Sequence, residues 1–267
     1  RIRADLAQEI ATLNRKPCLA VLMVGEDPAS LVYVRNRAKA CASVGIETIE
    51  RILPADASEN TVLLTLEALN KNPTIDGIII ESPLPKHLNR NAILKNLRDD
   101  KDVDGASVAN AGKLFTAVSG LLPCTPRAVM RLIEETGVPV AGSRTVVVGR
   151  SPVVGKPMAM MLLAKDATVT VAHSKTRHLE AVTKEADILV VAAGRAGLIT
   201  ADMVKPGALV IDVGINVNQD GKMTGDVDFE SVKEVAGWIT PVPGGVGPVT
   251  VAMLLLNTFE ASKRLKK

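Results

Sequence analysis

Short apolar runs rich in β-branched residues alternate with stretches of helical periodicity along nearly the whole chain of 267 residues. A continuous apolar run indicates a strand buried on both faces, whereas apolar positions that recur about every 3.6 residues indicate a helix. The predicted strands are Cys18–Val24, Glu47–Leu53, Gly77–Ile80, Thr145–Val148, Thr168–Ala172, Ile188–Ala192 and Ala208–Val213. The predicted helices lie near Ser30–Val44, Glu59–Leu69, Ala92–Leu97, Pro126–Glu135, Val154–Leu163, Thr176–Glu185 and Gly247–Leu265, and the chain also begins inside an apparent helix. This alternation predicts an α/β fold with parallel sheets covered on both faces.

A proline-containing segment, Leu121–Pro126, divides the chain. Its prolines interrupt the periodicity of both helices and strands. The part that follows has the order of a nucleotide-binding unit, and the part that precedes it is an α/β segment of similar size. We therefore expect two domains, an N-terminal α/β catalytic domain over residues 1–122 and a Rossmann-type domain over residues 123–246. The C-terminal helix, residues 247–267, is expected to pack back on the first domain.

Composition excludes several classes of function. A net charge of +3 over this length gives no case for nucleic-acid binding, and aromatic residues, at 2%, provide few platforms for stacking bases. No apolar run is long enough to span a membrane. The 47% of apolar residues is sufficient for a substantial core. We therefore expect no nucleic-acid partner and no membrane partner.

Cysteine usage indicates the compartment. The three cysteines, Cys18, Cys41 and Cys124, are odd in number, and neither they nor any Cys/His/Asp cluster has the spacing of a metal site. Reduced thiols fit a cytoplasmic protein best. The chain starts at Arg1 without an initiator methionine, which leaves open a removed organelle-targeting peptide.

A glycine turn follows the strand Thr145–Val148. Gly149 permits a tight turn, Gly155 opens the next helix, and Ser151 stands where a strict G-x-G-x-x-G pattern has its second glycine. The helix start offers free N–H groups and a positive dipole end to a phosphate. An ordinary strand-to-helix turn is the alternative for this segment alone.

The end of the next strand distinguishes the dinucleotides. NAD enzymes commonly place an acidic residue there, but His173–Arg177 contains a serine, Ser174, and two cations, and Arg150 stands in the glycine turn itself. Cations and hydroxyls suit a 2′-phosphate, which a carboxylate would repel. The pattern favours NADP as cofactor, although Lys175 and Arg177 also fit ordinary surface charges.

Small residues end the later strands of the second domain. Gly194 and Gly214 leave room for a ligand at the carboxyl ends of parallel strands, and Ile215 is placed to pack near a nicotinamide. Simple turn glycines are an equally good interpretation of Gly194. The histidines His87 and His178 are interpreted as surface residues.

Polar pairs in the first domain indicate a second site. Tyr33 and Arg37 lie four residues apart and share a helix face. Short-chain dehydrogenases have a similar dyad, but theirs follows the glycine turn, whereas Tyr33 precedes Gly149. The strand Gly77–Ile80 runs into a proline-rich rim, Glu81–Pro85, at the edge where α/β proteins bind ligands.

Two further loops contain candidate ligand-binding residues. In Lys101–Gly105, both Asp102 and Asp104 fit either a turn or a ligand contact, and composition alone favours the turn. Thr240–Pro248 contains almost only proline, glycine and valine, whereas flexible linkers usually contain serine, lysine or glutamate. This loop is better suited to lining a pocket.

Taken together, these segments resemble the methylenetetrahydrofolate dehydrogenase/methenyltetrahydrofolate cyclohydrolase family. The resemblance covers the chain nearly end to end, and the proline- and glycine-rich loop is its most specific motif. The matching segments, in family order, are Tyr33–Lys39, Ser82–Pro85, Lys101–Gly105, Pro123–Pro126, Val148–Gly155, His173–Thr176, Asp212–Asn216 and Thr240–Pro248.

The resemblance implies a reaction and roles for residues. The family oxidises 5,10-methylenetetrahydrofolate with NADP in one-carbon metabolism, usually hydrolyses the methenyl product to 10-formyltetrahydrofolate, and is typically homodimeric. By this resemblance the first domain binds folate, and the residues expected to act in catalysis are Tyr33, Arg37, Glu81 and Asp104. The residues expected to contact folate are Tyr33, Ile80, Glu81, Ser82, Asp104, Pro243, Gly244, Gly245, Val246 and Gly247. Those expected to contact NADP are Gly149, Arg150, Ser151, Ser174 and Ile215.

The sequence departs from the family at the chemistry. Arg37 stands where the family has its catalytic lysine, Glu81 where it has a glutamine, and Ser82 where it usually has leucine. We hypothesise that Arg37 and Glu81 contact each other, with Arg37 in solvent and Glu81 in a turn as the alternative. The expected function is an NADP-dependent dehydrogenase with weak or lost cyclohydrolase. A fully bifunctional enzyme and a non-catalytic folate- or nucleotide-binding relative are the competing hypotheses.

Overall fold

The computed structural model describes residues 1–26, 28–218 and 221–264, with the backbone alone at residues 28–30 and 32. The chain forms two compact units: unit 1 comprises Arg1–Cys124 with Val251–Lys267, and unit 2 comprises Thr125–Thr250. The sequence analysis placed the corresponding boundaries after Leu122 and after Val246. The helix predicted to run to Leu265 ends outside the described residues.

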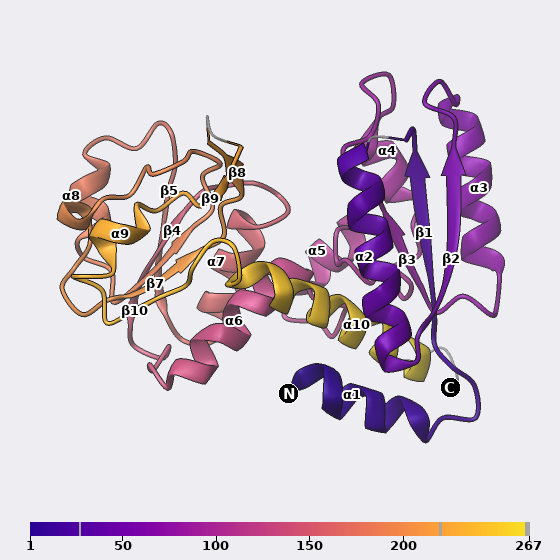
Figure 1. Ribbon diagram of the computed structural model, residues 1–267, viewed down its shortest axis with the longest axis horizontal. Helices are drawn as coiled ribbons and strands as arrows, with labels where there is room; N and C mark the ends of the chain where they lie inside the picture. The colour runs from indigo at the N-terminus through magenta and orange to yellow at the C-terminus, as the bar shows by residue number, and fades with distance from the viewer. Residues whose placement is uncertain (27, 219–220, 265–267) are drawn as a thin grey trace. The chain divides into compact units, whose positions relative to one another are not determined.

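Unit 1 contains a parallel sheet of three strands in the order β2–β1–β3 (Figure 1). Its strands are β1 (Cys18–Val24), β2 (Glu47–Leu53) and β3 (Gly77–Ile80), with the bounds predicted from the apolar runs. All seven residues of the central strand β1 are buried, which confirms that both faces of this sheet are covered. The edge strand β2 is largely exposed and carries charged residues, which protect a sheet edge against pairing with another chain.

Helices surround this sheet. They are α1 (Ile2–Ala11), α2 (Pro28–Val44), α3 (Glu59–Lys71), α4 (Arg90–Lys95) and α5 (Val108–Phe115). Ala20 and Leu22 of β1 pack with Val62 and Leu66 of α3 in one buried cluster. Helix α5 was not predicted from the sequence, because it is only eight residues long and contains a glycine, Gly112, and an asparagine, Asn110.

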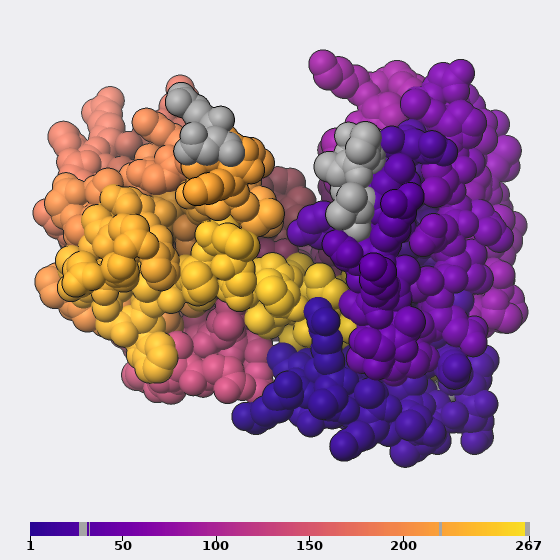
Figure 2. All heavy atoms as spheres, viewed as in Figure 1, coloured from indigo at the N-terminus to yellow at the C-terminus, as the bar shows by residue number. Residues whose placement is uncertain are grey.

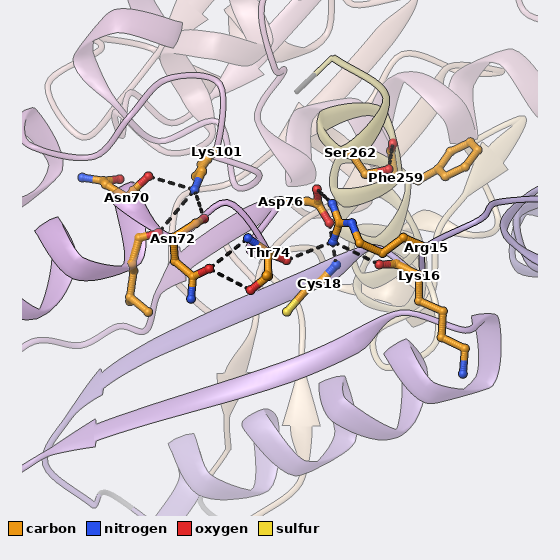
Figure 3. Close-up of polar contacts among 11 residues, drawn as sticks. Arg15, Lys16, Cys18, Asn70, Asn72, Thr74, Asp76, Lys101, Phe259 and Ser262 are labelled. Atoms are coloured by element: carbon orange, nitrogen blue, oxygen red, sulfur yellow. Dashed lines mark hydrogen bonds and ion pairs between the residues drawn. The ribbon is translucent and has the colours of Figure 1, made fainter. Parts of the chain in front are cut away.

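The loop Lys101–Gly105 is fastened beside β3. The N–H of Ile78 donates to the carbonyl of Lys101 at 2.7 Å, and a Cβ at Gly77 would lie 2.6 Å from Val103, so only glycine admits this approach. The buried Lys101 ammonium donates to carbonyls at the end of α3, at 2.8 Å to Asn70 and 2.7 Å to Asn72 (Figure 3). Lys101 therefore caps a helix and holds the start of the loop.

A second polar anchor lies at the amino ends of the same strands. The guanidinium of Arg15 lies 2.6 Å from the buried carboxylate of Asp76, which also accepts the N–H of Cys18 at 2.8 Å (Figure 3). The Asp76 bond raises the pKa of Arg15. These contacts fix the residue before β3 to the start of β1.

The C-terminal part of α10 (Val246–Arg264) belongs to unit 1. The buried amide of Asn257 donates to the carbonyls of Val103 and Leu122 at 2.7 and 2.9 Å. Near the chain ends, Lys263 lies 3.1 Å from Glu9 of α1, and indigo atoms of α1 lie beside yellow atoms of α10 in Figure 2. The final helix therefore supports the loop that precedes Asp104.

Unit 2 contains a parallel sheet of five strands in the order β10–β7–β6–β4–β5. Its strands are β4 (Arg144–Val148), β5 (Thr168–Ala172), β6 (Ile188–Val191), β7 (Leu209–Asp212) and β10 (Trp238–Ile239). A hairpin of β8 (Asn216–Val217) and β9 (Met223–Thr224) follows β7. The first strand of the unit, β4, pairs with β6 on one side and with β5 on the other, which is the arrangement of a Rossmann-type domain.

The helical elements of unit 2 are short. They are α6 (Cys124–Thr136, begun by the last residue of unit 1), α7 (Gly155–Leu163), α8 (Leu179–Thr183), α9 (Phe229–Val232) and a 3-10 turn over Ala201–Met203. The helix predicted over Thr176–Glu185 is shortened to α8, because Thr176 and His173 form a turn before it. The two-residue strands and α9 were not predicted, since elements of this length carry no periodicity.

Candidate active site

Arg37 and Glu81 form an ion pair in unit 1. Arg37 projects from α2, and Glu81 directly follows β3, where its N–H donates to the carbonyl of Leu22 at 2.8 Å. Nη1 of Arg37 lies 2.6 Å from Oε2 of Glu81, and Nη2 lies 3.5 Å from Oε1. The two side chains are only 8% and 11% exposed. The predicted contact is confirmed, and the alternative with Arg37 in solvent is wrong.

The two aspartates of the loop Lys101–Gly105 have different surroundings. Asp102 is fully buried and accepts the N–H groups of Ala106 and Ser107 and the amide of Asn110 at 2.8–3.0 Å. These bonds build the turn into α5. Asp102 is therefore a structural residue, and the turn interpretation is correct for it.

Asp104 has a free acceptor instead. Within residues 1–26, 28–218 and 221–264, no donor hydrogen-bonds to its carboxylate, which remains partly accessible. Burial, and next the charge of Asp102, raise the pKa of Asp104 to about 6, although the Arg37 and Arg90 cations oppose the shift. A carboxylate that is surrounded by protein but keeps open lone pairs is suited to accept hydrogen bonds from a ligand.

Arg90 is a charged neighbour that the sequence analysis missed. It begins α4, a helix capped by Asn89, and its charge acts on Asp104 from outside the loop. Its spacing from Arg37 and Asp104 along the chain gave no signal, because three separate elements of unit 1 bring these groups into range of one another.

Three other residues expected at this site lie close to Arg37 or Glu81 along the chain. Tyr33 lies one turn before Arg37 on α2 and is 53% exposed, Ile80 is buried at the end of β3, and Ser82 is exposed. The peptide bond from Ser82 to Pro83 is cis. These residues present a phenol and a hydroxyl to solvent beside the buried ion pair.

In unit 2, Gly149 directly follows β4 and has a backbone conformation that suits glycine. Its φ is 136°, and a Cβ there would lie 2.2 Å from the carbonyl oxygen of Ala192. A Cβ at Gly155 would lie 2.2 Å from the carbonyl oxygen of Gly149. Both glycines are therefore required for the close approach of strand and helix expected of a dinucleotide-binding turn.

Donors suited to phosphate surround this turn. Arg150, Ser151 and Ser174 are all exposed. The oxygen of Ser151 accepts the N–H groups of Val154 and Gly155 at 3.1 and 3.4 Å, which leaves its hydrogen to donate outward. His173 shapes the turn that carries Ser174, because its ring accepts the N–H of Lys175 at 3.1 Å.

The other expected ligand contacts of unit 2 lie in two loops. Ile215 is 57% exposed just before the β8–β9 hairpin. In the segment Pro243–Gly247, which runs into the first turn of α10, Pro243 and Gly244 are exposed, Gly245 and Val246 are buried, and Gly244 has a φ of 104°. A Cβ at Gly245 would lie 2.4 Å from the carbonyl of Pro241, so this loop is tightly turned.

Two buried aspartates of unit 2, Asp212 and Asp226, were not identified from the sequence as site residues. Their carboxylates organise the backbone around Gly194 and Ile215. Across the described ranges there is no cluster of three or more metal-binding side chains. No helix among them is both long and apolar enough to cross a membrane.

Comparison with known proteins identifies two domains of one family. The family model described as tetrahydrofolate dehydrogenase/cyclohydrolase, catalytic domain, matches residues 1–104. The model of the NAD(P)-binding domain of the same family matches residues 123–266. Together the two matches cover most of the chain.

Relatives and solved structures agree with these matches. The bifunctional protein FolD of Bordetella avium is 53% identical over 267 residues, covering 99% of this chain and 94% of its own. The crystal structure of the bifunctional dehydrogenase/cyclohydrolase FolD of Campylobacter jejuni has a TM-score of 0.96 and 44% identity, covering 98% of this chain and 95% of the other. A Trypanosoma brucei FolD, complexed with NADP and an inhibitor, has a TM-score of 0.93 and 38% identity, covering 98% of this chain and 94% of its own.

Proposed function

The chain belongs to the tetrahydrofolate dehydrogenase/cyclohydrolase family, and we propose that it is an NADP-dependent methylenetetrahydrofolate dehydrogenase whose cyclohydrolase activity is weak or lost. The first part follows from the family and its bifunctional relatives. The second part rests on one observation, the ion pair of Arg37 with Glu81.

Oxidation of 5,10-methylenetetrahydrofolate needs alignment more than proton transfer. NADP, when bound, supplies the acceptor of the hydride. The protein has to hold the donor carbon and the acceptor in a reactive orientation, and such positioning alone contributes a large part of a rate enhancement. Glu81 neutralises Arg37, so the guanidinium does not oppose the cationic methenyl product.

Hydrolysis of the methenyl product has a further requirement. Water must be activated and a proton accepted, which a lysine can do when its pKa is lowered. A guanidinium stays protonated at neutral pH, since the pKa of arginine is about 12.5 or higher. The Glu81 carboxylate is engaged by both guanidinium nitrogens and is poorly placed to take over this task.

The donors of unit 2 fit NADP. We assign the 2′-phosphate to Arg150 and Ser174, because a cation and a hydroxyl are exposed there and Lys175 and Arg177 add positive charge. The turn at Gly149 and Ser151 would hold the pyrophosphate. Ile215 would lie beside the nicotinamide.

For folate, we assign the pterin ring to Asp104. Its carboxylate has open acceptor positions, and the ring presents a fork of N–H donors. Tyr33, Ile80 and Ser82 would line the same site. We further propose a cytoplasmic homodimer, supported for the compartment by the three buried cysteines, which form no disulfide.

A fully bifunctional enzyme is the second candidate. The observation in its favour is Asp104, because a carboxyl with a pKa of about 6 has the strength of a general base near neutral pH. In that case the proton released on hydrolysis would pass to Asp104 and not to residue 37. Absence of any hydride transfer would instead leave a non-catalytic binding relative.

A double-mutant cycle on Arg37 and Glu81 tests the proposal. The purified wild type, Arg37→Lys, Glu81→Gln and the double variant are supplied separately with methylene- and with methenyltetrahydrofolate. A lysine introduced by Arg37→Lys stays protonated beside Glu81, and Glu81→Gln alone leaves Arg37 uncompensated, so the double variant should gain more cyclohydrolase activity than either single variant. If the double variant gains none, the pair does not limit hydrolysis.

A further inference from the structure

Asp226 lies at the centre of a buried polar network in unit 2. It is fully buried after β9, and its carboxylate accepts four hydrogen bonds of 2.6–2.8 Å. Three come from successive backbone N–H groups, those of Ala193, Gly194 and Arg195, and the fourth comes from the side-chain amide of Asn216. Such a row of N–H groups forms an anion-binding concavity, and here an internal carboxylate fills it.

These hydrogen bonds connect two loops at the edge of the sheet where the cofactor is proposed to bind. Ala193–Arg195 follow β6 and are exposed, and Asn216 follows β7. The two strands are parallel neighbours, so both loops lie at the carboxyl edge where sheets of this type bind dinucleotides. The strands β6 and β7 lie on one side of β4. The strand that precedes Ser174, β5, lies on the other side.

A second carboxylate fixes Asp226 itself. Asp212 accepts the N–H groups of Gly214, Asp226 and Val227 at 2.9–3.0 Å, and its own N–H donates to the hydroxyl of Thr240 at 2.8 Å. The packing leaves no space for adjustment. A Cβ at Gly214 would lie 2.3 Å from Cγ of Asp226, and a Cβ at Gly225 would lie 1.8 Å from Asp212.

Ile215 is the exposed residue between the anchored positions Gly214 and Asn216. We propose that Asp226 is a positioning residue for the nicotinamide half of NADP, which holds the Ala193–Arg195 turn and the Ile215 loop as one rigid edge without touching the cofactor. The inference rests on the proposed NADP site, and it goes beyond it by separating the two halves of that site.

The test compares two ligands on Asp226→Asn. The amide keeps the size of the carboxylate but turns an NH2 group toward two of the four donors, so the edge loses its anchor. Calorimetric dissociation constants are measured for NADP and for adenosine 2′,5′-bisphosphate, which lacks the nicotinamide half. NADP binding should weaken at least tenfold, and binding of the bisphosphate should stay within twofold of wild type. Equal weakening of both ligands, or no weakening, overturns the proposal.

Two further variants keep the result interpretable. Asn216→Ala removes one hydrogen bond and leaves Asp226 in place. It should weaken NADP binding at least threefold and leave binding of the bisphosphate unchanged, and unchanged NADP binding contradicts the proposal even if Asp226→Asn does not fold.

Asp187→Asn is the matched control, because Asp187 accepts one backbone N–H, that of Arg144, at the amino ends of the strands of the same sheet. It should leave both dissociation constants unchanged. Failure of the wild type to bind NADP would overturn the cofactor assignment itself, which is a distinct outcome.

Discussion

Arg37 and Glu81 lie 2.6 Å apart and are largely withdrawn from water. A charge in such a place is tolerated because its partner is present, so the two residues act as a unit. Their pairing joins α2 to the end of β3, the strand end that carries the rim of the proposed folate site. The same contact therefore bears on both the stability of unit 1 and its chemistry.

Removal of the Glu81 charge should show how much the stability of the protein depends on the ion pair. Glu81→Gln leaves the Arg37 guanidinium nearly buried without a counter-charge, and breaking a buried pair in this way costs about 3–5 kcal/mol. Chemical denaturation should show a lower free energy of unfolding by an amount of this order. The control is Glu67→Gln, whose partner Lys71 is 75% exposed, and it should leave the denaturation midpoint unchanged. An equally stable Glu81→Gln protein would mean that the pair contributes nothing.

Cofactor preference should depend on Arg150. Loss of a charge-assisted contact with a phosphate costs on the order of 1.5–3 kcal/mol, so Arg150→Ala should weaken NADP binding roughly ten- to a hundredfold. NAD binding should hardly change. Arg144→Ala is the matched control, because Arg144 is an exposed arginine at the start of β4, whereas Arg150 lies just beyond the end of that strand. Equal losses for NADP and NAD would contradict the assignment of Arg150 to the 2′-phosphate.

The two loop aspartates should separate binding from folding. Asp104→Ala should raise the Michaelis constant for folate or abolish turnover, while NADP binding is preserved and the melting temperature is not lowered. Asp102→Ala removes the acceptor of three hydrogen bonds and should lower the melting temperature. Steady-state kinetics and thermal melts of both variants check this, and the reversed pattern would show that the folate contact is Asp102.

The raised pKa of Asp104 should also appear in the pH dependence of stability. Its carboxyl has a folded-state pKa of about 6 against a usual value of 3.8, so ionisation is disfavoured by folding. Below pH 3.8 the group is protonated in both states, and as pH rises toward 6 the folded protein loses stability because of it. Asp104→Asn removes this cost and should be more stable than wild type by about 1–2 kcal/mol above pH 6, after allowance for partial exposure.

Denaturation of both proteins at about pH 4 and about pH 8 measures this difference. Asp187→Asn provides a control of opposite sign, because the bond with Lys205 and the N–H of Arg144 lower the pKa of Asp187. That carboxylate stabilises the fold at neutral pH, so its variant should be less stable there and approach wild type in acid. A constant advantage of Asp104→Asn at both pH values would show that its carboxyl pKa is not raised.

The buried strands were predictable because their apolar runs are continuous. The bounds of the buried strands β1 and β3 match those expected from the sequence, since one run is followed by a glycine, Gly25, and the other by a charged residue, Glu81. The hairpin and β10 were not predictable, because two-residue strands have no pattern of their own. β10 depends on its pairing with β7, and β8 and β9 depend on pairing with each other.

The candidate site divides in the same way. The contact of Arg37 with Glu81 could be expected because two departures from one family pattern had complementary charges. The network around Asp226 could not be predicted. Three of its donors lie more than thirty positions before Asp226 along the chain, and the fourth lies ten positions before it. The raised pKa of Asp104 likewise depends on the fold, because burial and the charge of Asp102 raise it while Arg37 and Arg90 oppose the shift from different helices.

The most direct test of the central claim follows both products of one reaction. Purified wild-type protein is mixed with methylenetetrahydrofolate and NADP, and the absorbance of NADPH and that of methenyltetrahydrofolate are recorded together, with an enzyme-free sample correcting for uncatalysed hydrolysis. We predict that the two products rise in equal amounts, because Arg37 cannot take part in the proton transfer that hydrolysis requires. Formation of 10-formyltetrahydrofolate at a rate that matches NADPH, with no accumulation of the methenyl compound, would contradict the account.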